Sequence, residues 1–170
     1  MIFFGHLGIT LFVGALLFMP LFFVAIGVML PDIVDKTFFI LGFLPCGRSL
    51  AHNLFFGPIV AAATYAITRR KDLALAILFG SYMHLIEDSR GFVPWLYTVV
   101  GYEFECMPIA LHIGIFEIVT ESVGIVLLLA VIFYRNKIIY LRERLNYVLK
   151  SYGDRRTRAK VRGKKRRNKK

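Results

Sequence analysis

Residues 7–30 read LGITLFVGALLFMPLFFVAIGVML, a block of about 24 residues that contains no charged side chain. An apolar helix of this length is long enough to cross the hydrocarbon core of a bilayer, about 30 Å thick. Pro20 interrupts the block, because proline removes a helical hydrogen bond and clashes with the preceding turn. The block therefore predicts either one kinked span or two short helices packed as an N-terminal hairpin.

The composition of the whole chain indicates a membrane protein. Its 170 residues are 57% hydrophobic, with a mean hydropathy of +0.62, whereas a soluble domain is about 45–50% apolar. No Lys or Arg precedes Lys36, so we expect no cleaved signal peptide. The predicted fold is an all-α, polytopic helical bundle in the cell membrane, surrounded by membrane lipid.

Further apolar segments follow the first block, at about residues 49–68, 73–88 and 108–134. A short apolar run at 38–44 cannot span a bilayer and is expected at its interface. The aromatic residues of the 90–107 loop are also typical of a membrane interface. Together these segments predict a membrane-embedded, hydrolase-like domain over residues 1–134.

The end of the chain is strongly basic. The net charge is +11, and the segment from Arg155 to Lys170 holds eleven Lys or Arg and no acid. We expect an amphipathic surface helix over 135–152 and a disordered tail over 153–170. Basic segments stay in the cytoplasm, where this tail would meet anionic lipid headgroups. It has no interleaved aromatics, so nucleic acid is not an expected partner.

Charge also predicts the topology of the chain. With the C-terminus in the cytoplasm, the basic turn at 69–71 is also cytoplasmic, and the segments 32–48 and 90–107 lie outside. The two cysteines, Cys46 and Cys106, would then share the outer side. They are either two free thiols or a disulfide.

Ionisable residues within apolar segments are costly and usually functional. Here they form spaced pairs, namely Asp32 with Asp35, Arg48 with His52, and His84 with Asp88. Helical residues four apart share one face, and carboxylate with imidazole suits Zn, Mn or Fe. The pairs predict a divalent-metal site toward the outer side. A structural polar network at helix ends is the alternative.

Whether four further residues can join the site depends on how the apolar blocks fold. A single first span would place His6 about 39 Å from Asp32, whereas a hairpin would bring His6 into the site. Glu117 and Glu121 are four apart and share a face, and both are further candidates. His112 is the last, although an ideal helix turns it about 140° from Glu117.

The ordered motifs resemble the family of inner-membrane-associated, metal-dependent hydrolases of the LexA-binding type. That family has Leu-Pro-Asp-x-x-Asp, then Arg-x-x-x-His, then Gly-x-x-x-His-x-x-x-Asp. The matching residues here are Gly5-His6, Leu30–Asp35, Arg48–His52 and Gly80–Asp88, within residues 5–91. The resemblance implies an all-helical membrane bundle with a hydrolytic metal site, and it favours the hairpin. Lys36 stands where the family commonly has His.

The predicted function is that of a membrane-bound, metal-dependent hydrolase for a phosphoester or lipid-linked substrate. The expected metal ligands are His6, Asp32, Asp35, His52, His84 and Asp88. Arg48 or Lys36 would stabilise an anionic group of the substrate. The alternative is a non-catalytic membrane protein, such as a metal- or proton-coupled transporter with Glu117 and Glu121 as relay. A third hypothesis is a scaffold whose tail recruits partners.

Overall fold

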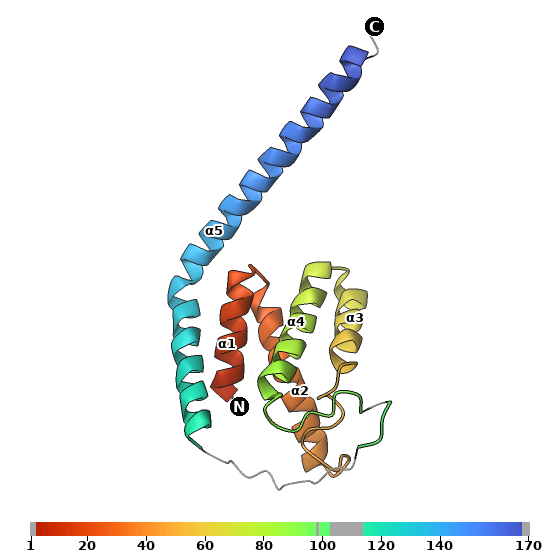
Figure 1. The fold of residues 1–170 in the computed structure, drawn as a ribbon, viewed down its shortest axis with the longest axis vertical. Helices are drawn as coiled ribbons and strands as arrows, with labels where there is room; N and C mark the ends of the chain where they lie inside the picture. Colours follow the sequence, from red (N-terminus) through yellow and green to blue (C-terminus); the bar gives the residue numbers. More distant parts are fainter. Residues whose placement is uncertain (1–2, 98, 103–113, 168–170) are drawn as a thin grey trace. The chain divides into compact units, whose positions relative to one another are not determined.

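The computed structural model describes residues 3–97, 99–102 and 114–167, and within these ranges it contains helices and no strand (Figure 1). The helices are α1 Phe3–Leu16, α2 Leu21–Ile40, α3 Phe56–Thr68, α4 Lys71–Asp88 and α5 Ile115–Arg167. The all-α prediction is confirmed. The chain divides into two compact units, the body Met1–Ile132 and the C-terminal segment Phe133–Lys170.

The first apolar block is a helical hairpin. Helix α1 ends at Leu16, and Phe18, two residues later, is left-handed with φ of 54°. The N–H of Met19 then donates to the carbonyl of Gly14 at 2.9 Å, which closes a helix C-terminus of the Schellman type. Pro20 follows as the N-cap of α2. Of the two expected arrangements, the hairpin is therefore the one that forms.

Helix α2 continues through Pro31 instead of ending before it. Proline lacks the N–H that would bond to the carbonyl four residues earlier. In this fold the carbonyl of Gly27 accepts a hydrogen bond from Ser81 Oγ of α4 at 3.2 Å. As a result Asp32 and Asp35 lie within a helix, and the run expected at 38–44 is in part the last turn of α2.

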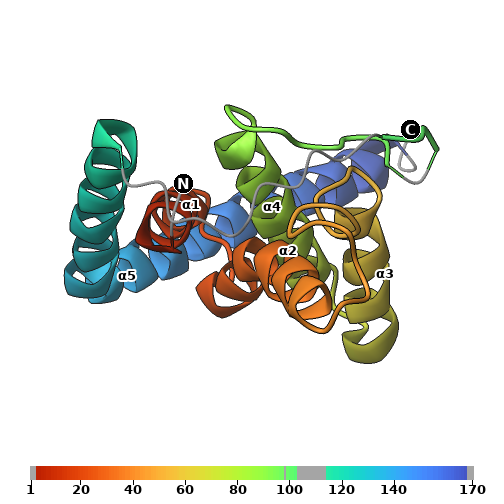
Figure 2. The ribbon, with the colours of Figure 1, turned by 90° about the horizontal axis from the view of Figure 1, so that it is seen from below.

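Helices α2 and α4 lie side by side in both views of the ribbon (Figure 2). A Cβ atom on Gly27 would overlap the carbonyl of Ile77, and one on Gly80 would overlap the backbone of Val24. The two backbones therefore touch, as at the small-residue interfaces of membrane helices. This contact sets the later turns of α2 beside the last turns of α4.

Helix α3 starts at Phe56, seven residues after the predicted start at residue 49. Residues 41–55 form a loop of bends and turns. The reason lies in Asn53, whose Oδ1 accepts the N–H groups of Phe55 and Phe56 at 2.8 and 3.1 Å. An asparagine oxygen on these free amides starts the helix.

Helix α5 begins in the body and packs against α1. A Cβ atom on Gly8 would overlap the backbone of Gly124, so these two helices also touch through glycine. Among the described residues, one helical segment, Ile115–Tyr134, is long and apolar enough to cross a bilayer by length and composition. Helices α1 and α3 are apolar but shorter.

The residues expected as a surface helix and a tail belong to the last part of α5, as far as the structure describes them. Helix α5 runs without a break across residues 134 and 152 to Arg167. The segment contains no proline, and Lys and Arg are good helix formers. Extending an existing helix is also easier than nucleating a new one. The expected division into a surface helix and a disordered tail stays a prediction.

Candidate metal centre

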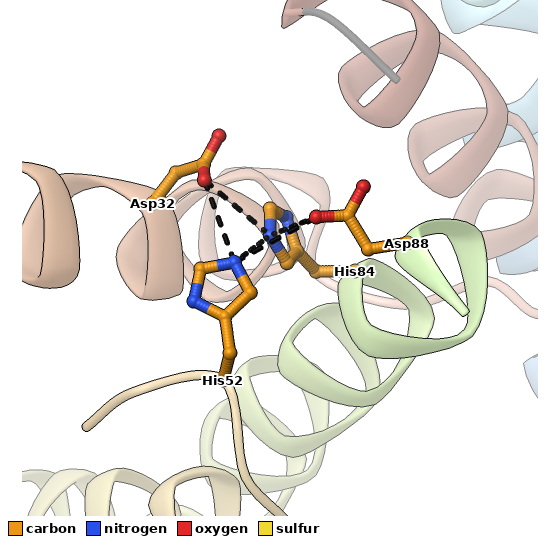
Figure 3. Close-up of side chains that lie close together, drawn as sticks. All are labelled: Asp32, His52, His84 and Asp88. Atoms are coloured by element: carbon orange, nitrogen blue, oxygen red, sulfur yellow. Dashed lines mark hydrogen bonds and ion pairs between the residues drawn. The ribbon is translucent and has the colours of Figure 1, made fainter. Parts of the chain in front are cut away.

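Four side chains meet at one point of the body (Figure 3). Asp32 comes from α2, His52 from the loop at 41–55, and His84 and Asp88 from the last turns of α4. Each offers one donor atom, and all four atoms lie within 4.8 Å of one another. Their convergence depends on the close crossing of α2 and α4.

The spacing of the donor atoms suits a four-coordinate ion. His52 Nε2 and His84 Nε2 lie 3.1 Å apart, and Asp32 Oδ1 lies 3.5 and 3.7 Å from them. Asp88 Oδ2 lies 3.7 Å from each of the two nitrogens. Tetrahedral ligands at about 2.0–2.1 Å from zinc are about 3.3 Å from one another. Two imidazoles and two carboxylates therefore fit such an ion with small adjustments.

Asp35 orients His52 instead of joining the four donors. Its Oδ2 accepts the Nδ1–H of His52 at 2.7 Å and the N–H of Ser49 at 2.7 Å, and its Oδ1 accepts the N–H of Ala51 at 2.8 Å. These bonds fix the tautomer that leaves Nε2 of His52 available. A carboxylate behind a histidine is the usual outer-shell partner in metal sites. The expected ligand Asp35 is thus a support of the site.

Lys36 and Arg48, the two cations expected to act in catalysis, each form an ion pair with a carboxylate of the metal group. Lys36 Nζ lies 2.6 Å from Asp32 Oδ2, and Arg48 Nη2 lies 2.8 Å from Asp88 Oδ2. The Lys36 and Arg48 side chains are 49% and 35% exposed, whereas those of His52 and Asp88 are almost completely buried. Both cations therefore lie on the accessible side of the group.

The hairpin brings His6 to the edge of the group. Its Nδ1 lies 2.7 Å from Glu87 Oε2, and its Nε2 lies 3.2 Å from Asp88 Oδ1. Its ring stacks on that of His84, with centroids 4.4 Å apart. His6 thus adjoins the four donors but is not one of them.

The remaining candidates lie elsewhere. Glu121 accepts the N–H groups of Phe4 and Gly5 at 2.7 and 3.0 Å, and so stabilises the first turn of α1. Glu117 Oε2 accepts the N–H of Gly114 at 3.0 Å at the start of its own helix. Neither glutamate belongs to the group of donors. His112 lies outside the described residues.

The charges around the group favour a bound cation. Burial alone would lower the pKa of His52, but hydrogen bonds with Asp32, Asp35 and Asp88 outweigh burial and raise the pKa of His52 to about 10. Buried carboxylates are costly unless positive charge compensates them. A divalent ion at the four donors would supply that charge and displace the proton.

Two residues next to the metal group, Glu87 and Thr10, are not among the candidates predicted from the sequence. Glu87 bonds to His6, and Thr10 Oγ1 donates to Glu87 Oε1 at 2.8 Å. A signal for Glu87 exists in the sequence, because a second acid directly before Asp88 is unusual in an apolar helix. Thr10 has no such signal, since threonine is common in apolar segments.

A scan against protein-family models finds no match to the chain, and neither the curated proteins nor the solved structures give a significant match. The resemblance to the inner-membrane-associated hydrolases therefore stays a prediction from the motifs.

Proposed function

We propose that this protein is a multi-pass membrane protein that carries a metal-dependent hydrolase centre. The observation that carries the proposal is the group formed by Asp32, His52, His84 and Asp88, whose donor atoms lie within 4.8 Å of one another. The donors suit zinc, manganese or iron. They converge from three separate segments and have carboxylates or cations behind them, as a prepared metal site does.

The distribution of polar residues supports several spans instead of one. Among its described residues the body buries three histidines and two aspartates, while large apolar side chains are exposed on its helices. Phe22 on α2 is 72% exposed and Ile67 on α3 is 83% exposed. A buried polar interior with an exposed apolar surface is costly in water and favourable in lipid. Glycine-mediated helix contacts agree with this environment.

Features at opposite ends of α4 support a proposed orientation in the membrane. The basic turn Arg69–Lys71 precedes the helix, and the metal group includes its last residue, Asp88. Cys46, in the loop that also carries His52, is disulfide-bonded and not a free thiol; Cys106 lies outside the described residues. Disulfides persist outside the cytosol. These features favour an outward-facing site and a cytoplasmic C-terminus, with its basic tail near anionic lipid.

The hydrolytic role rests on the side chains around the group. A bound divalent ion would lower the pKa of a coordinated water and so supply a nucleophile near neutral pH. Arg48 and Lys36 lie on the accessible side, where they could bind an anionic group of the substrate. A phosphoester, reaching the site from the lipid, has the required charge. Glu117 and Glu121 stabilise helix N-termini, so the transporter alternative has no supporting relay among the described residues.

Metal analysis of the detergent-purified chain tests the proposal. Wild-type protein should hold about one divalent ion per chain, and His84→Ala and Asp32→Ala should lose it. Asp72→Asn is the matched control, because Asp72 is exposed at the other end of α4 and pairs with Arg70. The same samples would be assayed with phosphoester substrates. Negligible metal in the wild type would refute the proposed function.

A further inference from the structure

A third imidazole, that of His6, lies beside the metal group and stacks on His84. His6 stands between two carboxylates, with Glu87 Oε2 at 2.7 Å from Nδ1 and Asp88 Oδ1 at 3.2 Å from Nε2. A carboxylate oxygen accepts hydrogen bonds, so Nδ1 of His6 donates to Glu87, whereas Nε2 lies at an ion-pair distance from Asp88 without the geometry of a hydrogen bond. Thr10 donates to the other oxygen of Glu87 at 2.8 Å. The result is a continuous chain of contacts from Thr10 to Asp88.

This chain is buried along its length. His6 and Asp88 are 1% exposed, and Thr10 is not exposed at all. The Glu87 side chain is 6% exposed. The two hydrogen bonds of Glu87, with Thr10 and His6, are costly to lose in such surroundings, because each lost bond leaves a buried atom unsatisfied. The chain therefore holds its members in fixed positions.

Asp88 needs such support. It is the last residue of α4, where the helix dipole disfavours a negative charge. Its Oδ2 lies 3.7 Å from the Nε2 of each histidine of the metal group and 2.8 Å from Arg48 Nη2. Its Oδ1 faces His6. The carboxylate is thus oriented from behind by an imidazole, which mirrors Asp35 orienting the imidazole of His52.

We propose that Glu87 is a positioning residue that acts through His6 to hold Asp88 in the metal group, with Thr10 fixing Glu87. The inference rests on the proposed metal centre. It assigns His6 to the outer shell, although the motif resemblance implies a ligand at that position. Outer-shell partners of this kind change metal affinity by about 10–100-fold when they are replaced.

The test measures the dissociation constant of Zn²⁺, by competition with a fluorescent chelator, on the detergent-purified full chain. Glu87→Gln and His6→Asn should each weaken binding by about 10–100-fold while the stoichiometry at saturating Zn²⁺ stays unchanged. The absorption spectrum of the Co²⁺-loaded protein should also keep its intensity, because the four ligands remain. Thr10→Val should weaken binding by a smaller factor.

Two controls separate positioning from a loss of folding. Thr10→Ser keeps the hydroxyl and should restore the affinity that Thr10→Val loses. Thr64→Val removes an equivalent hydroxyl, which in α3 bonds only its own helix at Val60, and should bind as the wild type does. This pair remains informative if the Glu87 or His6 variant fails to fold.

The outcomes distinguish the two proposals. If wild-type protein binds no Zn²⁺, the metal centre itself is refuted. If the wild type binds Zn²⁺ and Glu87→Gln binds it equally well, only the positioning role is refuted. A loss of Co²⁺ absorption in His6→Asn would show that His6 is a ligand and would likewise overturn the assignment.

Discussion

Replacing Asp35 by asparagine should weaken both the fold of the 41–55 loop and the metal site. Asp35 is fully buried, and its Oδ2 accepts two hydrogen bonds, from Ser49 N–H and His52 Nδ1–H, both at 2.7 Å. In Asp35→Asn the side-chain amide can keep its oxygen toward Ala51, which sets an NH₂ group against these two donors. The substitution therefore removes two charge-assisted hydrogen bonds.

The magnitude follows from those two bonds. Hydrogen bonds to charged groups contribute about 1.5–3 kcal/mol each, so the free energy of unfolding should fall by about 3–6 kcal/mol. His52 also loses the partner that fixes its tautomer, so Zn²⁺ affinity should fall by about 10–100-fold. The effect on affinity should exceed that of Asp72→Asn, which changes an exposed ion pair.

Two measurements on detergent-purified protein check this prediction. Thermal unfolding without metal reports the stability of the body, and chelator competition reports the dissociation constant of Zn²⁺. If Asp35→Asn unfolds at the wild-type temperature and binds Zn²⁺ within twofold of the wild type, the assigned role of Asp35 is refuted. A large loss of affinity with unchanged unfolding would refute the stability estimate alone.

Three other predictions concern packing, backbone satisfaction and pH. Gly27→Ala should lower the unfolding temperature markedly, because its Cβ would overlap a backbone carbonyl of α4, whereas Gly101→Ala, which meets nothing within 4 Å, should not. Ser81→Ala should cost about 1–3 kcal/mol in unfolding free energy by leaving a buried carbonyl unpaired. Adding Pro31→Ala should recover part of that loss, because it restores the helical N–H; additive losses would contradict the account. Zn²⁺ affinity should rise between pH 6 and 8. The pKa of His52 is raised to about 10 in the metal-free site, so His52 must lose a proton when the ion binds. Zn²⁺ titrations at several pH values measure this, and an affinity that does not change with pH would contradict it.

Local sequence patterns were sufficient for the helices and for part of the site. Charge-free apolar blocks indicate helices, and the proline at residue 20 indicates a kink or a turn without deciding between them. The spacing of His84 and Asp88 indicates one helix face, and both side chains do reach the same point. These inferences succeed because they depend on backbone geometry within a single helix, which neighbouring elements change little.

Only the tertiary structure shows that Asp32 and Asp35 have different roles. Asp32 and Asp35 are three residues apart on α2, so the sequence pattern treats them alike. The rotation of α2 against α4 turns Asp32 toward the Nε2 atoms of the two histidines, while Asp35 meets the loop amides and the Nδ1 of His52. That rotation depends on where the two glycine-lined backbones touch, which is a long-range packing property.

The sequence by itself determined an all-helical, apolar chain with acids and imidazoles at helical spacing, because those features follow from composition and from the period of the helix. Only the tertiary structure decided that the first block folds back as a hairpin, that α3 starts at Phe56, and that Glu87 supports His6. The turn of the hairpin and the start of α3 are set by single hydrogen bonds, at Gly14 and Asn53, which have no periodic pattern. Glu87 and His6 lie 81 residues apart, and such a pair leaves no periodic signal in a single sequence.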